Sequence, residues 1–245
     1  MGVVSIGIIG CGTVAETCHL PAVKSLPNLA IKGLADINSD QARSLAEKFG
    51  LEDVSIHTNY QQLLREPDID AVWILTPPKL HAEMVINSLK NGKHVLCEKP
   101  LATSPEEIEA IKKALKRQTE ASRFTVLMPA HNFIFTPCFH RAVQIVKKGG
   151  IGRVTGLTGC AVSNLYFYKA KTDFRSLAKG GVIEDQLPHL IYLSQDVAGP
   201  CLKVVSVKPR SKGRTGAQDV SVEAELQGGA RAELAAAWSG FLPTL

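Results

Sequence analysis

The most informative pattern near the N-terminus is a glycine-rich turn. It spans residues 10–15, reads Gly-Cys-Gly-Thr-Val-Ala, follows an apolar run typical of a buried strand, and opens a helix. Gly10 permits a tight turn, Gly12 lets the backbone come close to a pyrophosphate, and Ala15 allows close packing of helix on strand. The phosphates would meet the free N–H groups and the positive end of the helix. This spacing predicts a dinucleotide site that includes Gly10, Gly12, Thr13 and Val14.

Asp36 ends the next predicted strand, where a carboxylate can accept hydrogen bonds from the ribose hydroxyls of an adenosine. The same charge would repel a 2′-phosphate, so the pattern favours NAD over NADP as the cofactor. The alternative is that Asp36 only caps the following helix, a role that Asn38 or Ser39 can also take. A third strand ends at Thr76 and Pro77. These two residues either border the cofactor crevice or lie in a loop that merely ends the strand.

A parallel sheet would bring these strand ends to one edge. From residue 3 to about 125, apolar runs alternate with helical patterns, which is typical of βαβ units. The expected strands are Ser5–Gly10, Ile31–Asp36, Ala71–Thr76, His94–Cys97 and Thr125–Pro129. The expected helices are Val14–Ser25, Ser39–Phe49, Tyr60–Arg65, His81–Lys90 and Ser104–Ala121, the last opened by a capping box of Ser104 and Glu107. We predict a dinucleotide-binding domain over residues 1–128, with the doubly wound α/β sheet of a Rossmann fold.

After about residue 130 the pattern changes to a helix followed by strands of antiparallel character. The expected helices are Phe139–Lys148 and Pro188–Val197, and the expected strands are Val154–Ser163, Leu202–Lys208, Val220–Leu226 and Arg231–Trp238. Residues 227–230 read Gln-Gly-Gly-Ala and predict a hairpin turn between the last two strands. We therefore expect a second domain, residues 129–245, of α+β type with a mostly antiparallel open sheet.

The composition is that of a folded protein with no dominant charge. The 245 residues are 45% hydrophobic, and the net charge of +5 is spread along the sequence, which does not predict a nucleic-acid surface. The basic stretch at Lys112, Lys113, Lys116 and Arg117 is interpreted as the wet face of a helix. The six cysteines and the histidines lack metal-ligand spacing, and there is no leader or long apolar run. We expect reduced thiols, no metal, no membrane and a cytoplasmic location.

Four further motifs follow in order along the sequence. Residues 76–81 read Thr-Pro-Pro-Lys-Leu-His, residues 98–100 read Glu-Lys-Pro, and residues 150–154 read Gly-Ile-Gly-Arg-Val. Residues 180–189 contain a glycine pair followed by the spacing D-x-x-x-H. With these motifs the protein resembles the Gfo/Idh/MocA family of oxidoreductases from residue 5 to about residue 200.

The resemblance implies hydride transfer between NAD(P) and a secondary hydroxyl or ketone of a small sugar, inositol or related polyol. It implies a second domain that contacts the substrate and is a candidate interface for a homo-oligomer. It also implies that Lys99 contacts both substrate and nicotinamide ribose and that the Lys99–Pro100 bond is cis. The catalytic candidates are then Lys99, Asp185 and His189; the substrate ligands are these three with Asn132; and His81, Glu98 and Lys99 join the cofactor residues.

Structural roles remain open for these residues: Lys99 as a surface lysine, Asp185 as a helix cap, and His189 as a packed histidine near a helix start at Pro188. If they do chemistry, His189 is the better base, because an imidazole ordinarily titrates near pH 6.5. Lys99 would hold the hydroxyl and stabilise developing alkoxide charge. The positive nicotinamide ring nearby would lower the pKa of Lys99, which leaves the reverse assignment open as an alternative. Asp185 would orient the imidazole or bind a neighbouring hydroxyl.

Several positions depart from the family pattern. After Asn132 the family often has an arginine where this protein has Ile134; Leu187 replaces a glycine, and Tyr192 replaces an acidic residue. His131 is a further candidate for lining the pocket. Family members usually continue with further strands, so we expect the second domain to be reduced or truncated. The alternative function is an NAD-binding ligand sensor or regulator without dehydrogenase activity, which the catalytic candidates, present together, oppose.

Overall fold

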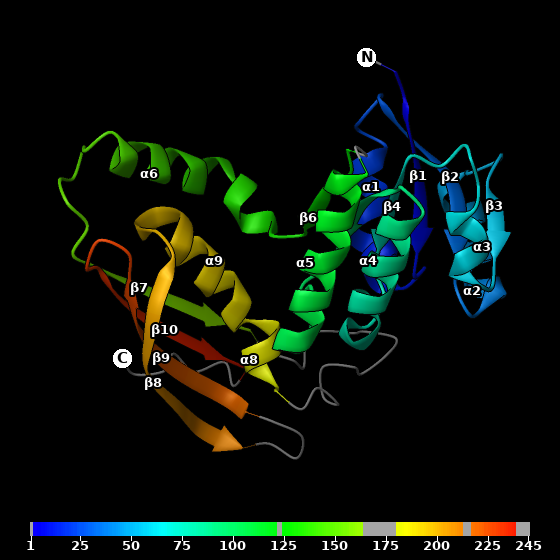
Figure 1. The fold of residues 1–245 in the computed structure, drawn as a ribbon. Coiled ribbons are helices and arrows are strands. Elements are labelled where there is room, and N and C mark those ends of the chain that lie inside the picture. The colour runs from blue at the N-terminus through cyan, green and yellow to red at the C-terminus, as the bar shows by residue number, and fades with distance from the viewer. Residues whose placement is uncertain (1, 122–123, 164–179, 213–216, 239–245) are drawn as a thin grey trace. The chain divides into compact units, whose positions relative to one another are not determined.

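The protein is described by a computed structural model that covers residues 2–121, 124–163, 180–212 and 217–238. It divides into two compact units, Met1–Ala130 and His131–Leu245 (Figure 1). None of the helices in the described ranges combines the length and the apolar character that a membrane span requires.

The first unit is built on a six-stranded parallel sheet with the strand order β3-β2-β1-β4-β5-β6. Its strands are β1 (Val4–Ile9), β2 (Leu29–Ala35), β3 (Ser55–His57), β4 (Ala71–Ile74), β5 (His94–Cys97) and β6 (Leu127–Pro129). This order reverses direction at β1 and β4, which is the crevice where doubly wound sheets bind ligands. The predicted Rossmann sheet is confirmed. The strand β3 was not among the predicted ones, because its three residues, Ser-Ile-His, are too few to establish a strand pattern.

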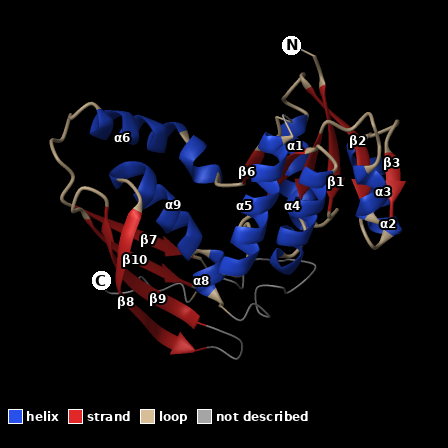
Figure 2. Ribbon diagram, viewed as in Figure 1, coloured by secondary structure: helices blue, strands red, loops and turns tan. Residues whose placement is uncertain are grey.

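Helices cover both faces of this sheet (Figure 2). They are α1 (Leu20–Val23), α2 (Ser39–Phe49), α3 (Tyr60–Leu64), α4 (His81–Lys90) and α5 (Pro105–Glu120). Alternate residues of β4 point to opposite faces. Trp73 packs with residues of α1 and α2, whereas Val72 packs with residues of α3, α4 and α5. Burial on both sides explains why the strands read as apolar runs without alternation.

The helix after the glycine turn differs from the single α-helix predicted over residues 14–25. A π-helical turn, η1 (Ala15–His19), precedes the short α1. Two residues explain the change. Pro21 has no N–H to offer the carbonyl four residues before it. The hydroxyl of Thr17 donates to the Thr13 carbonyl (2.8 Å), the group that the Thr17 N–H would use in a regular α-helix.

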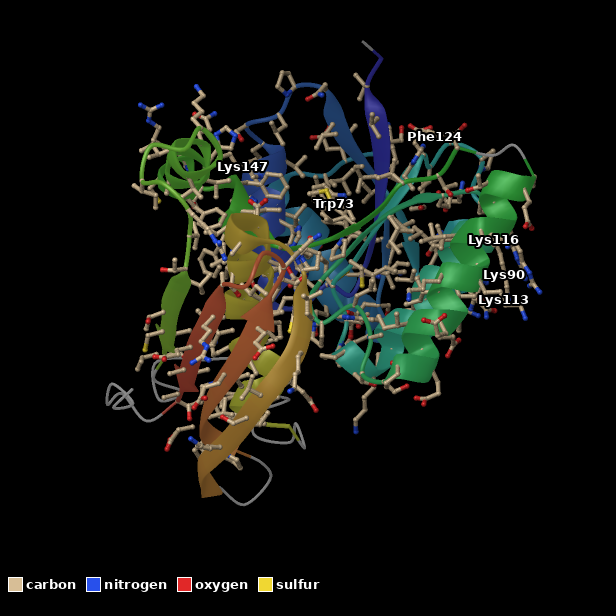
Figure 3. The ribbon with its side chains drawn as sticks, turned by 60° about the vertical axis from the view of Figure 1, so that its left-hand side comes forward. Trp73, Lys90, Lys113, Lys116, Phe124 and Lys147 are labelled. Carbon is tan, nitrogen blue, oxygen red and sulfur yellow. The ribbon has the colours of Figure 1, made fainter. Side chains whose placement is uncertain are left out.

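The helix α5 begins with a variant of the predicted capping box, in which the carboxylate of Glu107 reaches the residue before the N-cap Ser104. The Glu107 N–H donates to the Ser104 hydroxyl (3.3 Å), and the Glu107 carboxylate accepts from the Thr103 N–H (2.6 Å). The basic stretch on this helix is exposed, and Lys113 and Lys116 project away from it (Figure 3). The interpretation of the basic stretch as a solvent-exposed helix face is therefore confirmed.

The second unit contains a four-stranded sheet with the order β7-β10-β9-β8. The strands are β7 (Gly156–Val162), β8 (Cys201–Lys212), β9 (Ala217–Leu226) and β10 (Arg231–Ala237). Only β7 and β10 pair in parallel; β10 with β9 and β9 with β8 are antiparallel. The predicted mostly antiparallel α+β sheet is confirmed. Gly228 and Gly229 both have positive φ in the turn that joins β9 to β10, at the predicted hairpin.

The helical elements of this unit are η3 (Asn132–Phe135), α6 (Pro137–Lys147), α8 (Val182–Asp185) and α9 (Leu187–Ala198). Leu187 and Leu190 of α9 pack with Val182 of α8 on the apolar face of β9 and β10. Pro188 lies in the first turn of α9, as predicted. Asp185 lies just before this helix, as predicted, and is also the last residue of the short helix α8, which follows the glycine pair.

Candidate functional site

The glycine turn crosses the end of β4 closely. Gly10 has φ +96°, and a Cβ at this position would lie 2.9 Å from both the carbonyl carbon and the carbonyl oxygen of Leu75. A side chain is therefore excluded both by the backbone conformation and by the neighbouring strand end. The backbone then turns into the helix, where the Glu16 N–H donates to the Gly12 carbonyl (3.1 Å) and Thr13 and Val14 form the first turn.

Gly12 stands in a different environment. Its φ is not positive, and a Cβ would have only Gln41 Nε2 within 4 Å, at 3.9 Å. Neither backbone strain nor packing within the protein requires a glycine there. The open space over this stretch of backbone, at a helix start, fits the close approach of a pyrophosphate. The residues present therefore fit a dinucleotide cofactor.

Asp36 follows β2 and connects with the glycine turn. Its Oδ2 accepts from the Cys11 N–H (2.8 Å), and its Oδ1 accepts from the Asn38 N–H (2.9 Å). The N-cap of α2 is Asn38, whose side chain accepts from the Asp40 and Gln41 N–H groups, so Asp36 is not the helix cap. Burial, and then the charge of Asp36, raise the pKa of the Cys11 thiol to about 12. Cys11 consequently stays neutral beside the carboxylate.

The segment after β4 is tied to the Glu-Lys-Pro segment by His81. This side chain is fully buried (0% exposed), and its Nδ1 and Nε2 lie 2.7 Å from the carbonyl oxygens of Pro100 and Thr76. Thr76 also donates its hydroxyl to the Met84 sulfur (3.4 Å). Pro77 precedes the short helix η2 (Pro78–Leu80). His81 thus connects the loop after β4 with the loop after β5 at the carboxyl edge of the sheet.

The Glu-Lys-Pro segment follows β5, and its Lys99–Pro100 bond is cis, as predicted. The Glu98 carboxylate accepts from the Lys99 N–H (3.2 Å) and pairs with His19 Nε2 (3.0 Å). Burial raises the pKa of Glu98, but the hydrogen bond and charge of His19, followed by the Lys99 N–H and charge, outweigh it and hold the pKa below its ordinary value. The Glu98 carboxylate therefore stays ionised next to the main chain of Lys99.

His19 is a residue that sequence reasoning missed. It comes from η1, near the glycine turn, and its ring lies 5.3 Å from that of Trp73 on β4. Through Glu98 it links the helix of the cofactor turn to the segment that carries Lys99. No periodicity marks a histidine for such a contact. One signal for this contact was available in the sequence. The helix that carries His19 starts, and the strand β5 before Glu98 ends, at the same edge of the parallel sheet.

In the second unit, His189 lies in a cluster of aromatic side chains. Its Nδ1 is 2.8 Å from the Tyr192 hydroxyl, and its ring packs edge-on against Phe133 (4.9 Å between centroids). The Tyr192 hydroxyl donates to Asn132 Oδ1 (3.4 Å) and accepts from the Phe133 N–H (3.4 Å). His131 stacks on Tyr192 at 4.2 Å. The structure thus brings together the predicted residues Asn132 and His189 and adds Tyr192.

Asp185, the acidic candidate of the second unit, is buried. Its Oδ2 accepts from the Trp238 indole N–H (3.2 Å) and from the Gln186 side chain (2.8 Å). The carboxylate therefore anchors α8 to the residue that follows β10. These contacts differ from those of a helix N-cap, which was the alternative role considered for Asp185. Among the described residues, no group of histidine, cysteine, aspartate or glutamate side chains is arranged to hold a metal ion.

A parallel sheet with this strand order, a glycine turn bonded to an acidic strand end and a Glu-Lys-Pro segment after β5 define a dinucleotide-binding domain of the Rossmann type. The family profile described as "Oxidoreductase family, NAD-binding Rossmann fold" matches residues 4–125. A dTDP-3,4-didehydro-2,6-dideoxy-alpha-D-glucose 3-reductase from Streptomyces violaceoruber is 30% identical over 244 residues, which cover 95% of this protein and 68% of that one. The protein belongs to the Gfo/Idh/MocA family, and its first unit has the family's NAD-binding fold.

Two other relatives show the range of this family. A levoglucosan dehydrogenase from Pseudarthrobacter phenanthrenivorans is 29% identical over 210 residues, 80% of this protein and 51% of that one. The crystal structure of a 3-ketoreductase from Actinomadura kijaniata, in complex with TDP-benzene and NADP, superposes with a TM-score of 0.82 at 26% identity, covering 96% of this protein and 70% of that one. The matched region spans only 40 to 51% of the length of several curated relatives.

Proposed function

We propose that this protein is an NAD-dependent dehydrogenase or reductase that acts on a secondary hydroxyl or ketone of a small sugar, inositol or related polyol. The proposal rests on two contacts in the first unit. Asp36 accepts a hydrogen bond from the Cys11 N–H in the glycine turn, and Glu98 accepts one from the Lys99 N–H. The names of the relatives, among them levoglucosan dehydrogenase and myo-inositol 2-dehydrogenase, support the substrate class.

The cofactor contacts proposed for the first unit follow from its strand ends. Gly12 and the first helical turn would hold the pyrophosphate, and each carboxylate oxygen of Asp36 has a second lone pair for a ribose hydroxyl. Ile37, 94% exposed beside Asp36, offers an apolar surface to the adenine. The negative charge of Asp36 supports NAD over NADP. Thr76, Pro77, His81 and Glu98 shape the rest of the crevice.

The bound cofactor would supply the chemistry of hydride acceptance and donation at the nicotinamide. The protein's own residues would manage the proton. We assign to Lys99 the binding of the reacting hydroxyl and the stabilisation of its developing negative charge. His189 is the proposed base that takes the hydroxyl proton, which requires a distance of about 2.6–3.2 Å in the reactive complex. Asn132 is proposed as a substrate ligand, and Asp185 as a residue that supports His189 or a neighbouring hydroxyl.

The experiment is a screen of NAD reduction against levoglucosan, myo-inositol, other sugars and amino sugars, with the wild type, Lys99→Ala and Lys90→Ala. Lys90 is an exposed lysine at the end of α4 and serves as the matched control. Turnover that falls by about 10²–10⁴ in Lys99→Ala and persists in Lys90→Ala supports the proposal. Unchanged turnover in Lys99→Ala rejects the assigned site.

The alternative function is an NAD-binding sensor or regulator, and one specific observation favours it. Ile134 stands in η3 beside Asn132, at a position that would otherwise offer a cation to a polyol. Binding of a sugar by calorimetry without turnover of any compound in the panel would favour this alternative. For partners, we propose a small-molecule substrate and self-association through the second sheet, and for location the cytoplasm.

A further inference from the structure

The hydroxyl of Tyr192 lies at the centre of the aromatic cluster in the second unit. His189 and Tyr192 are three residues apart on α9 and therefore share one face of the helix. The helix η3 adds the side chain of Asn132 and the main-chain N–H of Phe133. Three groups thus converge on one phenolic oxygen: His189 Nδ1 at 2.8 Å, Asn132 Oδ1 at 3.4 Å and Phe133 N at 3.4 Å.

The chemistry of these groups decides where the protons lie. A tyrosine hydroxyl has one proton to donate and lone pairs that accept. The amide oxygen of Asn132 can only accept, so the Tyr192 hydroxyl donates its hydrogen bond to it, and the Phe133 N–H can only donate to the phenolic oxygen. The phenolic oxygen is left to accept from His189. Nδ1 of His189 must then carry a hydrogen, and the neutral imidazole has its basic lone pair on Nε2.

We propose that Tyr192 is a positioning residue that holds His189 in the Nδ1–H tautomer, so that Nε2 is the atom that accepts the substrate proton. This inference rests on the proposed function, in which His189 is the base. During the reaction the proton passes from the substrate oxygen to Nε2, while the Tyr192 hydroxyl keeps its proton and continues to donate a hydrogen bond to Asn132 Oδ1. The Nδ1–H bond to the phenolic oxygen becomes charge-assisted when the imidazole is protonated, which strengthens it.

The neighbouring rings favour this arrangement. His131 stacks on Tyr192 with an angle of 14° between the rings, and Phe133 meets the His189 ring at 73°. Both contacts restrict rotation of the rings that form the hydrogen bond. Burial lowers the pKa of His131, which therefore stays neutral at neutral pH. A protonated His189 consequently does not face a second positive imidazole across Tyr192.

The first experiment reads the tautomer directly and needs no substrate. In protein labelled with ¹⁵N-histidine, long-range ¹H–¹⁵N correlation spectra distinguish Nδ1–H from Nε2–H for each of the seven histidines. The signal of His189 is assigned by its loss in His189→Gln. We expect the Nδ1–H form in the wild type and a shift toward Nε2–H in Tyr192→Phe. The matched control is Tyr60→Phe, which removes a hydroxyl bonded to Glu83 and Asn87 in the first unit and leaves His189 unchanged.

A second variant separates positioning from simple packing. Asn132→Leu removes the acceptor of the Tyr192 proton but keeps Tyr192 itself. The hydroxyl is then able to donate to His189 Nδ1, so we expect the tautomer to invert to Nε2–H. An Nε2–H form in the wild type, or a tautomer that neither Tyr192→Phe nor Asn132→Leu changes, would overturn the proposal.

The kinetic experiment uses a substrate found in the screen of NAD reduction. We expect Tyr192→Phe to lower kcat by about 10-fold or more, with KM within a few-fold, because hydrogen bonds to charged groups are stronger than neutral ones. A change confined to KM would overturn the positioning role. If no substrate is turned over, the proposed function fails, while the tautomer spectra still decide the role of Tyr192.

Discussion

The two units of this protein build their candidate sites from different kinds of contact. In the first unit, two functional side chains meet main-chain groups: Asp36 accepts two N–H groups, and His81 faces two carbonyl oxygens, whereas Glu98 combines one N–H group with the side chain of His19. In the second unit, side chains meet side chains, as in the contact of Tyr192 with His189 and Asn132. Main-chain partners are offered by any residue at a strand end, whereas side-chain partners require particular residue types on different elements.

This difference predicts how each unit responds to substitution. A site built on backbone groups is sensitive to backbone geometry, so its weak points are glycines and strand ends. A site built on side-chain pairs is sensitive to the removal of single functional groups and leaves the fold largely intact. Substitutions in the two units should therefore separate cofactor affinity and stability from the rate of the chemical step.

The largest effect is expected from His189→Ala in the second unit. We expect kcat/KM for an identified substrate to fall by about 10²–10⁴, the usual range for acid–base groups, while NAD affinity stays within a few-fold. Calorimetry and steady-state kinetics measure the two quantities. His140→Ala, which alters a histidine on α6, is the control. Wild-type turnover by His189→Ala would show that the second unit does not supply the base.

The next effect compares two glycines of one turn. Gly10→Ala is expected to destabilise the fold by about 2 kcal/mol or more, because a positive φ costs an alanine about 1–2 kcal/mol and its Cβ meets the backbone of Leu75. Gly12→Ala has room for its Cβ, so we expect a near-normal unfolding midpoint but weaker NAD binding. Thermal unfolding and calorimetry measure these changes. Equal stability of the two variants would contradict the contrast drawn between them.

Asp36→Ala tests the cofactor contact at the end of β2. The variant loses one or two hydrogen bonds to the adenosine ribose, each contributing about 0.5–1.5 kcal/mol. NAD binding should therefore weaken by roughly 10-fold, and the preference for NAD over NADP should become smaller. Asp40→Ala, an exposed acid in the first turn of α2, is the matched control. Tighter binding of NADP than of NAD by the wild type would reject the assignment of Asp36.

The smallest effect concerns the ion pair of His19 with Glu98. The pKa of Glu98 is lower in the folded protein than its ordinary value of 4.5, so the carboxylate adds stability above that pH and loses it as the pH falls. In His19→Ala, burial is opposed only by Lys99, and the pKa of Glu98 should rise. We expect the midpoint of acid unfolding, followed by circular dichroism, to move upward by less than about one pH unit. An equal midpoint of acid unfolding in the wild type and in His19→Ala would show that His19 does not lower the pKa of Glu98.

Much of the first unit could be predicted because its signals are local. The glycine turn and the helix cap of α5 each depend on a few consecutive residues and their backbone geometry, whereas the cis bond at Lys99–Pro100 was predicted from the resemblance of the Glu-Lys-Pro segment to the family. The predictions failed where neighbouring features competed. Pro21 and Thr17 converted the start of the first helix into a π-helical turn, and the three-residue strand β3 was too short to show a strand pattern.

The sequence by itself determined the class of the fold, the dinucleotide turn, the acidic strand end at Asp36 and the motifs that contain Lys99 and His189. Only the tertiary structure decided their partners. His19 and Glu98 are 79 residues apart, and Tyr192 and Asn132 are 60 apart. The physical reason is that a motif expresses short-range backbone geometry, whereas a long-range pair forms only when packing of whole elements brings two side chains together, and no local spacing encodes that meeting.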